Sequence, residues 1–178
     1  MTDTNLIPFN EEERIENLKK YKILYTKSEP IFDQLAAIAA TTLNAPLAMI
    51  NFVDRAKVWT KANQNGDSGM EHDRQVSLCS LAILNDKVTV FEDLEKEFPR
   101  VVNPMTAGEY GFRFYAAAPI ITNEGFNVGS VCVVDKTSRS FSEEDQRKLE
   151  RVANMVTNEM NKRVTKRSPL IKKLGVLV

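Results

Sequence analysis

Residues 114–135 read FYAAAPIITNEGFNVGSVCVVD. Two apolar runs, Phe114–Thr122 and Asn127–Asp135, flank a four-residue connection that contains a glycine. Apolar, β-rich runs on either side of such a connection predict an antiparallel hairpin. Both runs are apolar at consecutive positions, which is typical of strands that are covered on both faces. This stretch therefore predicts the centre of a buried sheet.

Further apolar runs upstream predict more strands of the same sheet. Leu47–Val53 and Val58–Ala62 flank a short polar connection, as the strands of a hairpin do, and Val88–Phe91 reads as a short strand. Between these runs, residues 63–73 are predicted to form a polar loop, and Val76–Leu84 has the pattern of a short helix.

The segment 92–110 is predicted to be irregular, because Pro99 and Pro104 prevent a long helix. A loop of this length in a compact domain is more often functional than idle. We expect residues 63–112 to cover one face of the sheet and to leave a cleft of the kind that small ligands occupy.

Apolar residues at three- and four-residue spacing predict three amphipathic helices. The first spans residues 10–26 with Asn10 as N-cap, the second begins after Ser28 with Pro30 in its first turn, and the last begins at the cap residue Ser142. The predicted buried stripes are Ile15, Leu18, Tyr21 and Tyr25; Ile31, Phe32, Leu35, Ile38, Ala39 and Leu43; and Leu149, Val152, Ala153, Val156 and Met160.

The order of these elements predicts an α+β fold. Strands joined by hairpins indicate a central antiparallel sheet of about five or six strands, with the N- and C-terminal helices on one face and short helices and loops forming a pocket on the other. We expect a disordered N-terminal segment over residues 1–9, one domain over residues 10–163, and a basic tail or linker over residues 164–178.

Composition excludes several classes of function. The chain has 178 residues with 24 basic and 24 acidic side chains, so it lacks the basic excess of a nucleic-acid-binding protein. No apolar run approaches the roughly 20 residues of a membrane span, and the N-terminus lacks the pattern of a secretory signal. We therefore expect a cytoplasmic protein with no nucleic-acid or membrane partner.

Neither a metal site nor a cofactor is predicted. The single histidine, His72, lies in a polar loop, and Cys79 and Cys132 fit neither a CxxC motif nor a zinc cluster. One loop histidine also provides no cysteine–histidine or serine–histidine pair, so no catalytic residue is assigned.

Eight residues are candidates for lining the predicted pocket: Asn51, Trp59, Arg74, Ser77, Cys79, Arg113, Tyr115 and Cys132. Trp59 either stacks on a planar ligand or covers the sheet as a core residue. Arg113 either clamps an anionic ligand or pairs with Asp135 or Asp93 to hold the irregular insert against the sheet.

The remaining candidates also have two interpretations. Arg74 and Ser77 precede a short helix, where they either bind an anion or, for Ser77, cap the helix. Cys79 and Cys132 either face each other as a redox pair or are small buried hydrophobic residues. A reactive thiol requires a nearby cation, and Arg74 is the nearest one in sequence to Cys79.

Five stretches carry a resemblance to a known family. They are YKILYT at 21–26 with Glu29 and FDQL at 32–35; APLAMI at 45–50 running to Asp54; VWTKA at 58–62; RQVSLC at 74–79 with AIL at 82–84; and GFRFYAAAP at 111–119 leading to GSVCVVD at 129–135. In this order and spacing the chain resembles a GAF domain of the bacterial subgroup found beside histidine kinases and diguanylate cyclases.

The resemblance implies a sensory or regulatory role, with a small molecule in the pocket and a homodimer formed through the terminal helices. It does not identify the ligand, and Cys79 is followed by serine rather than by the histidine that usually marks bilin attachment. Two alternatives stay open: a dimerisation or scaffold module without a ligand, and a thiol enzyme of the methionine-sulfoxide-reductase type.

Overall fold

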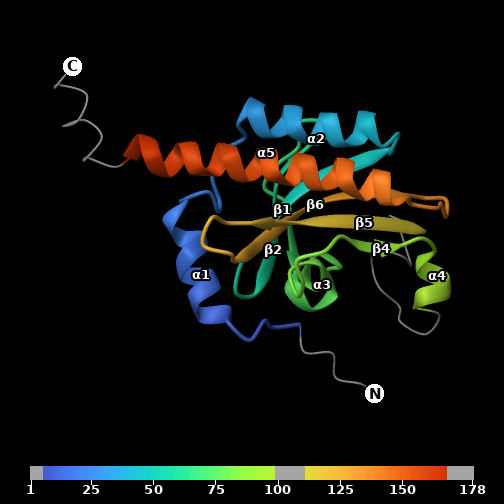
Figure 1. Cartoon of the computed structure of the whole chain (residues 1–178), viewed down its shortest axis with the longest axis horizontal. Coiled ribbons are helices and arrows are strands. Elements are labelled where there is room, and N and C mark those ends of the chain that lie inside the picture. The colour runs from blue at the N-terminus through green and yellow to red at the C-terminus, as the bar shows by residue number, and fades with distance from the viewer. Residues whose placement is uncertain (1–5, 99–110, 168–178) are drawn as a thin grey trace.

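The computed structural model describes residues 6–98 and 111–167, which form a single six-stranded antiparallel sheet with helices on both faces (Figure 1). The elements in chain order are α1 Glu11–Lys20, α2 Pro30–Thr42, β1 Leu47–Val53, β2 Lys57–Asn63, β3 Glu71–Asp73, the 3-10 turn η1 Arg74–Val76, α3 Cys79–Ala82, β4 Thr89–Phe91, α4 Leu94–Glu97, β5 Phe114–Ile121, β6 Asn127–Asp135 and α5 Glu143–Arg167. The strands lie in the order β3-β2-β1-β6-β5-β4, so the predicted α+β fold is confirmed.

The hairpin of β5 and β6 lies at the centre of the sheet, as the sequence predicts. Phe114 pairs with Asp135 and Ala118 with Val131, while β1 pairs with the other edge of β6. At Gly129 the strands approach so closely that a Cβ atom would lie 2.2 Å from the carbonyl oxygen of Asn51. Only glycine fits this contact without displacing β1.

Helices α2 and α5 cover one face of the sheet, which we call the helix face (Figure 1). Side chains of β5 and β6 that point to this face, such as Ala116 and Val133, pack against Leu149 and Val156 of α5. The capping of α5 is as predicted: Ser142 Oγ accepts a hydrogen bond from the Asp145 backbone N–H at 3.1 Å.

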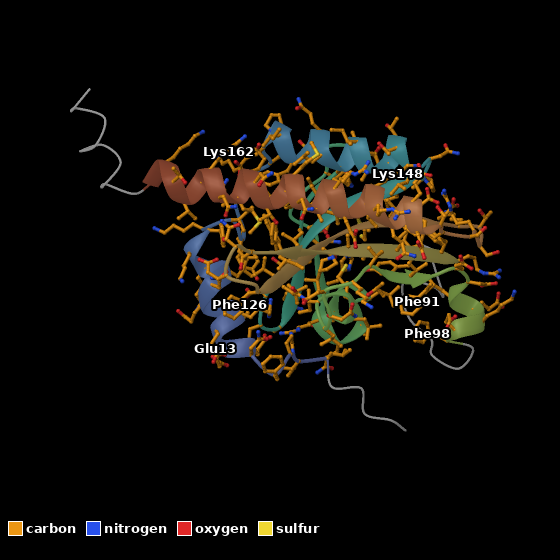
Figure 2. All side chains as sticks on the ribbon, viewed as in Figure 1. Glu13, Phe91, Phe98, Phe126, Lys148 and Lys162 are labelled. Atoms are coloured by element: carbon orange, nitrogen blue, oxygen red, sulfur yellow. The ribbon has the colours of Figure 1, made fainter. Side chains whose placement is uncertain are left out.

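The short helices α3 and α4 cover the opposite face, which we call the α3 face (Figure 1). Leu78, Ala82 and Leu94 pack there against the alternate residues of β1, β5 and β6. Phe91 and Phe98 meet edge to face near α4, with ring centres 5.0 Å apart (Figure 2). Both faces are therefore covered, as the consecutive apolar residues indicate; residues 99–110 of the predicted insert lie outside the described residues.

The first helix is shorter than predicted, because α1 ends at Lys20 rather than near residue 26. Lys22 and Tyr25 adopt positive φ angles, and the chain turns so that Thr26 Oγ1 and the carbonyl of Lys27 accept hydrogen bonds from the buried Lys61 ammonium group. Tyr25 is consequently half exposed instead of continuing the buried stripe. Helix α1 crosses one end of the sheet, where Arg14 Nη1 donates to the carbonyl of Val53.

Other boundaries also differ from the prediction. The loop 63–73 contains β3, because its last residues pair with Lys57–Trp59 of β2. The segment Val76–Leu84 is divided between η1 and α3, since Ser77 is extended. Residues 1–9 were expected to be disordered, but the structure describes the chain from Leu6 onwards. The backbone carbonyl of Leu6 accepts a hydrogen bond from Arg74.

The second helix starts at Pro30, as predicted, but two residues of its predicted buried stripe are exposed. Neither Asn10 nor Ser28 forms a side-chain cap; Ser28 Oγ donates to Asp33 instead. Ile31 and Ile38 point to solvent, being 37% and 41% exposed, because only one side of α2 meets the sheet. Helix α5 continues to Arg167, so residues 164–167 of the expected tail are helical.

Candidate functional site

A group of polar side chains lies buried on the α3 face, in the middle of the sheet. Asn51 of β1, Tyr115 of β5 and both Ser130 and Cys132 of β6 face the same side, and Cys79 approaches them from the start of α3. Each of these five residues is at most 3% exposed. We call them the Asn51 cluster. Polar groups in a sheet core are costly unless they are paired, so their partners define the site.

Asn51 is the central residue of this cluster. Its Nδ2 atom donates to the sulfur of Cys79 at 3.3 Å and to the sulfur of Cys132 at 3.5 Å. Its Oδ1 atom accepts a 2.8 Å hydrogen bond from Thr60 Oγ1, the residue paired with it on β2. Since a hydroxyl donates to the amide oxygen, the amide nitrogen must point at the two sulfurs.

Cys79 receives further donors and is held by the turn before α3. The Tyr115 hydroxyl donates to its sulfur at 3.4 Å, and its backbone N–H donates to Ser77 Oγ at 3.3 Å. Ser80 Oγ donates to the carbonyl of Arg74 at 2.6 Å and ties the same turn together. Ser77 is thus part of the turn that leads into α3, whose N-cap residue is Leu78.

The donors around Cys79 change the acidity of the cluster. The hydrogen bond from Cys132 lowers the pKa of Cys79 most, against the effect of burial, and with those from Tyr115 and Ser77 brings it to about 6. Donating to Cys79 raises the pKa of Cys132 well above its ordinary value, and burial raises that of Tyr115. The two thiols therefore titrate as a pair, and Cys79 holds the first negative charge.

Ser130 completes the cluster in a different way. Its hydroxyl is fully buried near Cys79, yet Oγ forms no hydrogen bond within normal distance to the described residues. A buried hydroxyl without a partner costs about 1–3 kcal/mol. The cluster thus retains one unused hydrogen-bonding group beside its two thiols.

Arg113 lies away from the Asn51 cluster and holds the insert, which is the structural one of its two predicted roles. Its guanidinium group binds both carboxylate oxygens of Asp93 at 2.9 and 3.0 Å, and Glu95 at 3.0 Å. The Arg113 carbonyl also accepts from the Leu94 N–H. The hydrogen bonds to Arg113 lower the pKa of Asp93 although its burial acts in the opposite direction.

Two predicted pocket residues lie elsewhere. Trp59 packs in the core of the helix face, where its ring lies 5.8 Å from that of Tyr25, on the opposite side of the sheet from the Asn51 cluster. Arg74 does not approach the Cys79 sulfur as sequence proximity suggests. Its guanidinium group is buried in an ion pair with Glu11, which also binds Arg14.

Sequence reasoning missed Thr60 and Ser130. Thr60 follows Trp59 in β2 and lies opposite Asn51, so alternation along the predicted hairpin indicates that it shares the face of Asn51. Ser130 precedes Cys132 by two residues and shares its face for the same reason. The sequence gives no comparable signal for the contact between Cys79 and Cys132, since it depends on how α3 docks.

The fold and the site together define an α+β domain in which a covered antiparallel sheet carries a polar cluster under short helices. The chain belongs to the GAF domain family, whose model matches residues 28–160. This confirms the resemblance seen in the sequence. None of the helices in residues 6–98 and 111–167 has both the length and the apolar character needed to cross a membrane.

One curated relative also matches the chain. The chain is 32% identical over 150 residues to a cyclic di-GMP phosphodiesterase of Pseudomonas aeruginosa, covering 84% of this chain and 25% of that protein. It thus spans about a quarter of the relative's length.

Two solved structures are similar to the chain in fold. The GAF domain from an Acinetobacter phosphoenolpyruvate-protein phosphotransferase has a TM-score of 0.65 at 12% identity and covers 92% of this chain and 99% of that one. A domain of a putative two-component sensor histidine kinase from Sinorhizobium meliloti has a TM-score of 0.59 at 16% identity, with coverages of 79% and 97%. Both likenesses show that the chain shares the fold of these domains.

Proposed function

We propose that the chain is a regulatory module that binds a small molecule at the Asn51 cluster and relays its presence through α5. The observation that carries this proposal is that the cluster and α5 lie on opposite faces of the same two strands. Cys132 and Tyr115 belong to the cluster, whereas their neighbours Val133 and Ala116 pack against α5. A ligand that shifts β5 or β6 therefore acts directly on the helix packing.

The far end of α5 is also tied to the rest of the domain. Arg163 forms an ion pair with Glu29, and its Nη2 atom donates to the carbonyl of Lys22 at 3.0 Å. Glu29 in turn binds the buried Lys61 of β2 at 2.7 Å. Movement of the sheet is thus coupled to the orientation in which α5 leaves the domain.

The chemistry of the cluster disfavours an anionic ligand. Its hydrogen-bonding groups are an amide, hydroxyls and thiols, and the guanidinium groups of Arg74 and Arg113 lie elsewhere, bound to carboxylates. An anionic ligand would lose its hydration, find no free cation in return and meet the negative charge of Cys79. A neutral molecule with one or two hydrogen-bonding groups fits these partners.

Thermal unfolding in the presence of uncharged metabolites tests the proposal. A ligand at about 100 times its dissociation constant stabilises the folded state by roughly 2.7 kcal/mol, which raises the melting temperature by about 5–10 °C. Tyr115→Phe removes a hydroxyl from the cluster without changing the ring, and we expect it to reduce this rise. Tyr25→Phe, on the helix face, is the matched control and should retain it. If no compound distinguishes the two variants, the proposed site is wrong.

A second candidate function, dimerisation, rests on a different surface. Ile31 and Ile38 of α2 are exposed, as are Met155 and Val164 of α5. A homodimer formed through these two helices would bury them, and the module would then act as a scaffold. Sedimentation measures this directly: Ile38→Lys should shift the protein towards monomer, whereas Leu84→Lys, equally exposed near α3, should not. A wild-type monomer at all concentrations contradicts it.

A further inference from the structure

We propose that Cys79 and Cys132 are a reversible oxidation site, at which a hydroperoxide converts the two thiols into an intramolecular disulfide. Disulfide formation itself does not depend on the proposed ligand. Only its consequence for α5 rests on the proposed function, because it uses the same sheet as the relay.

The geometry brings the two sulfurs together although they are far apart in sequence. Both are hydrogen-bonded to the single Nδ2 atom of Asn51, at 3.3 and 3.5 Å, so they are neighbours around one donor. Both cysteines are free thiols. Because the two sulfurs share one donor, a shift of α3 towards β6 can bring them to the S–S length of about 2.05 Å.

The surroundings assign different roles to the two sulfurs. Cys79 accepts hydrogen bonds from Asn51 and from the Tyr115 hydroxyl, which stabilise its thiolate form, so it is the attacking sulfur. Cys132 is fixed in the central strand β6 and is the resolving sulfur. Asn51 and Tyr115 act as positioning residues, because they orient Cys79 and do not themselves react.

The chemistry balances with a hydroperoxide as the oxidant. The Cys79 thiolate attacks one peroxide oxygen, the O–O bond breaks, and the leaving alkoxide or hydroxide takes up the proton released by Cys79. The Cys132 sulfur then attacks the resulting sulfenic sulfur, the S–O bond breaks, and hydroxide leaves with the Cys132 proton as water. The thiol pair loses two electrons, and the hydroperoxide is reduced to an alcohol or water.

The approach of the sulfurs must displace α3, since β6 is held between two neighbouring strands. The displacement has a defined path to α5. The carbonyl of Ile83, directly after α3, accepts a hydrogen bond from Asn127 Nδ2 at 3.3 Å, and Asn127 pairs with Ile121 in β5. Thr157 Oγ1 of α5 donates to the carbonyl of Ile121 at 3.0 Å. Oxidation is therefore transmitted to the same helix as in the proposed relay.

Intact-mass measurement after hydrogen peroxide treatment of the reduced protein, without added ligand, tests the proposal. We expect the wild-type monomer to become lighter by two hydrogen atoms, to lose both alkylatable thiols in denaturant, and to recover them with dithiothreitol. Cys79→Ala and Cys132→Ala cannot form this bond and should keep the mass of the reduced protein or gain oxygen. Tyr115→Phe should form the disulfide several-fold more slowly.

Other outcomes overturn the proposal. Two free thiols remaining in folded, peroxide-treated wild-type protein would show that the pair is inert, and oxygen addition or disulfide-linked dimers would show a different chemistry. These results need only the wild-type chain, so they hold even if an alanine variant fails to fold. The ligand screen is run separately, on fully reduced protein, and tests the proposed function. Ligand binding and disulfide formation can therefore fail independently of each other.

Discussion

The carboxylate of Glu29 binds the ammonium group of Lys61 at 2.7 Å, and the Lys61 side chain is completely buried. The same carboxylate pairs with Arg163 from the far end of α5. Burial lowers the pKa of Lys61, against the effect of Glu29, which raises it. One acidic side chain thus connects β2, the start of α2 and the end of α5.

Replacing Glu29 should cost more than replacing its surface partner. Glu29→Gln leaves the Lys61 charge buried without a counter-charge, and we expect the free energy of unfolding to fall by about 2–3 kcal/mol. Arg163→Gln removes a partly exposed pair and should cost about 1 kcal/mol or less. Urea unfolding measures both. If the two variants lose the same free energy of unfolding, the buried charge of Lys61 does not depend on Glu29 as we infer.

A third substitution isolates the buried charge. Lys61→Met keeps most of the side-chain volume and removes the charge, so it should change the free energy of unfolding by only about 1 kcal/mol. Combined with Glu29→Gln, it should recover most of the loss caused by Glu29→Gln alone. Losses that simply add would mean that the two side chains are energetically independent.

Glu11 should make the stability of the domain sensitive to acid. Burial raises its pKa, but hydrogen bonds from Arg14 and Arg74 outweigh this and lower the pKa from 4.5 to about 2. A carboxylate with a depressed pKa stabilises the fold fully above its unfolded pKa, and this stabilisation is lost as the pH falls from about 4.5 towards 2.

The pH dependence of unfolding tests this expectation. Wild-type protein should lose stability between pH 5 and about 2 more steeply than Glu11→Gln, whose side chain does not titrate. Glu13→Gln is the matched control, since Glu13 lies on the exposed side of α1 (Figure 2), and its slope should remain that of the wild type. Parallel curves for wild type and Glu11→Gln would contradict the prediction.

Gly129 should not tolerate a side chain. The Cβ atom of Gly129→Ala would lie 2.2 Å from the carbonyl oxygen of Asn51, so β1 or β6 must move apart. We expect a loss of about 3 kcal/mol, the upper part of the usual range for overpacking. Gly66→Ala places its Cβ in open space and should cost only about 1 kcal/mol of backbone strain at its φ of +83°.

The first thiol ionisation should occur at unusually low pH. The hydrogen bond from Cys132, followed by those from Tyr115 and Ser77, overcomes burial and brings the pKa of Cys79 to about 6. Thiolate absorbance should therefore rise with pH around 6 in the wild type. Tyr115→Phe removes a donor to the thiolate and should shift the rise to higher pH. A rise near 6 that persists in Cys79→Ala would assign it to another group.

The sequence predicted the strands because local residues mark them, and it missed the end of α1 because no local residue marks that end. β1, β5 and β6 are marked locally, by consecutive apolar residues and by the turns at their ends, so Leu47–Val53 and Asn127–Asp135 have the predicted bounds. Nothing local ends α1 at Lys20. Beyond it the chain turns so that Thr26 and Lys27 supply oxygen atoms to Lys61, which lies 35 and 34 residues away from them in sequence.

The candidate site shows the same division. The sequence identified Asn51, Tyr115, Cys79 and Cys132, and it also placed Trp59 with them. Alternation along a strand determines that Trp59 and Thr60 point to opposite faces, but not which face the helices cover. Docking of α2 and α5 places Trp59 in the helix-face core and leaves Thr60 beside Asn51.

By itself, therefore, the sequence determined the family, the central hairpin and the residue types available for a site. Only the tertiary structure decided which of them meet. The amide of Asn51 reaches both sulfurs because α3 docks on the face of the sheet that carries Cys132. Arg74, five residues before Cys79, instead binds Glu11 on α1. Such contacts depend on packing between segments that are distant in sequence. Burying a charge or polar group is costly unless a partner is packed against it, and that partner can come from any part of the chain.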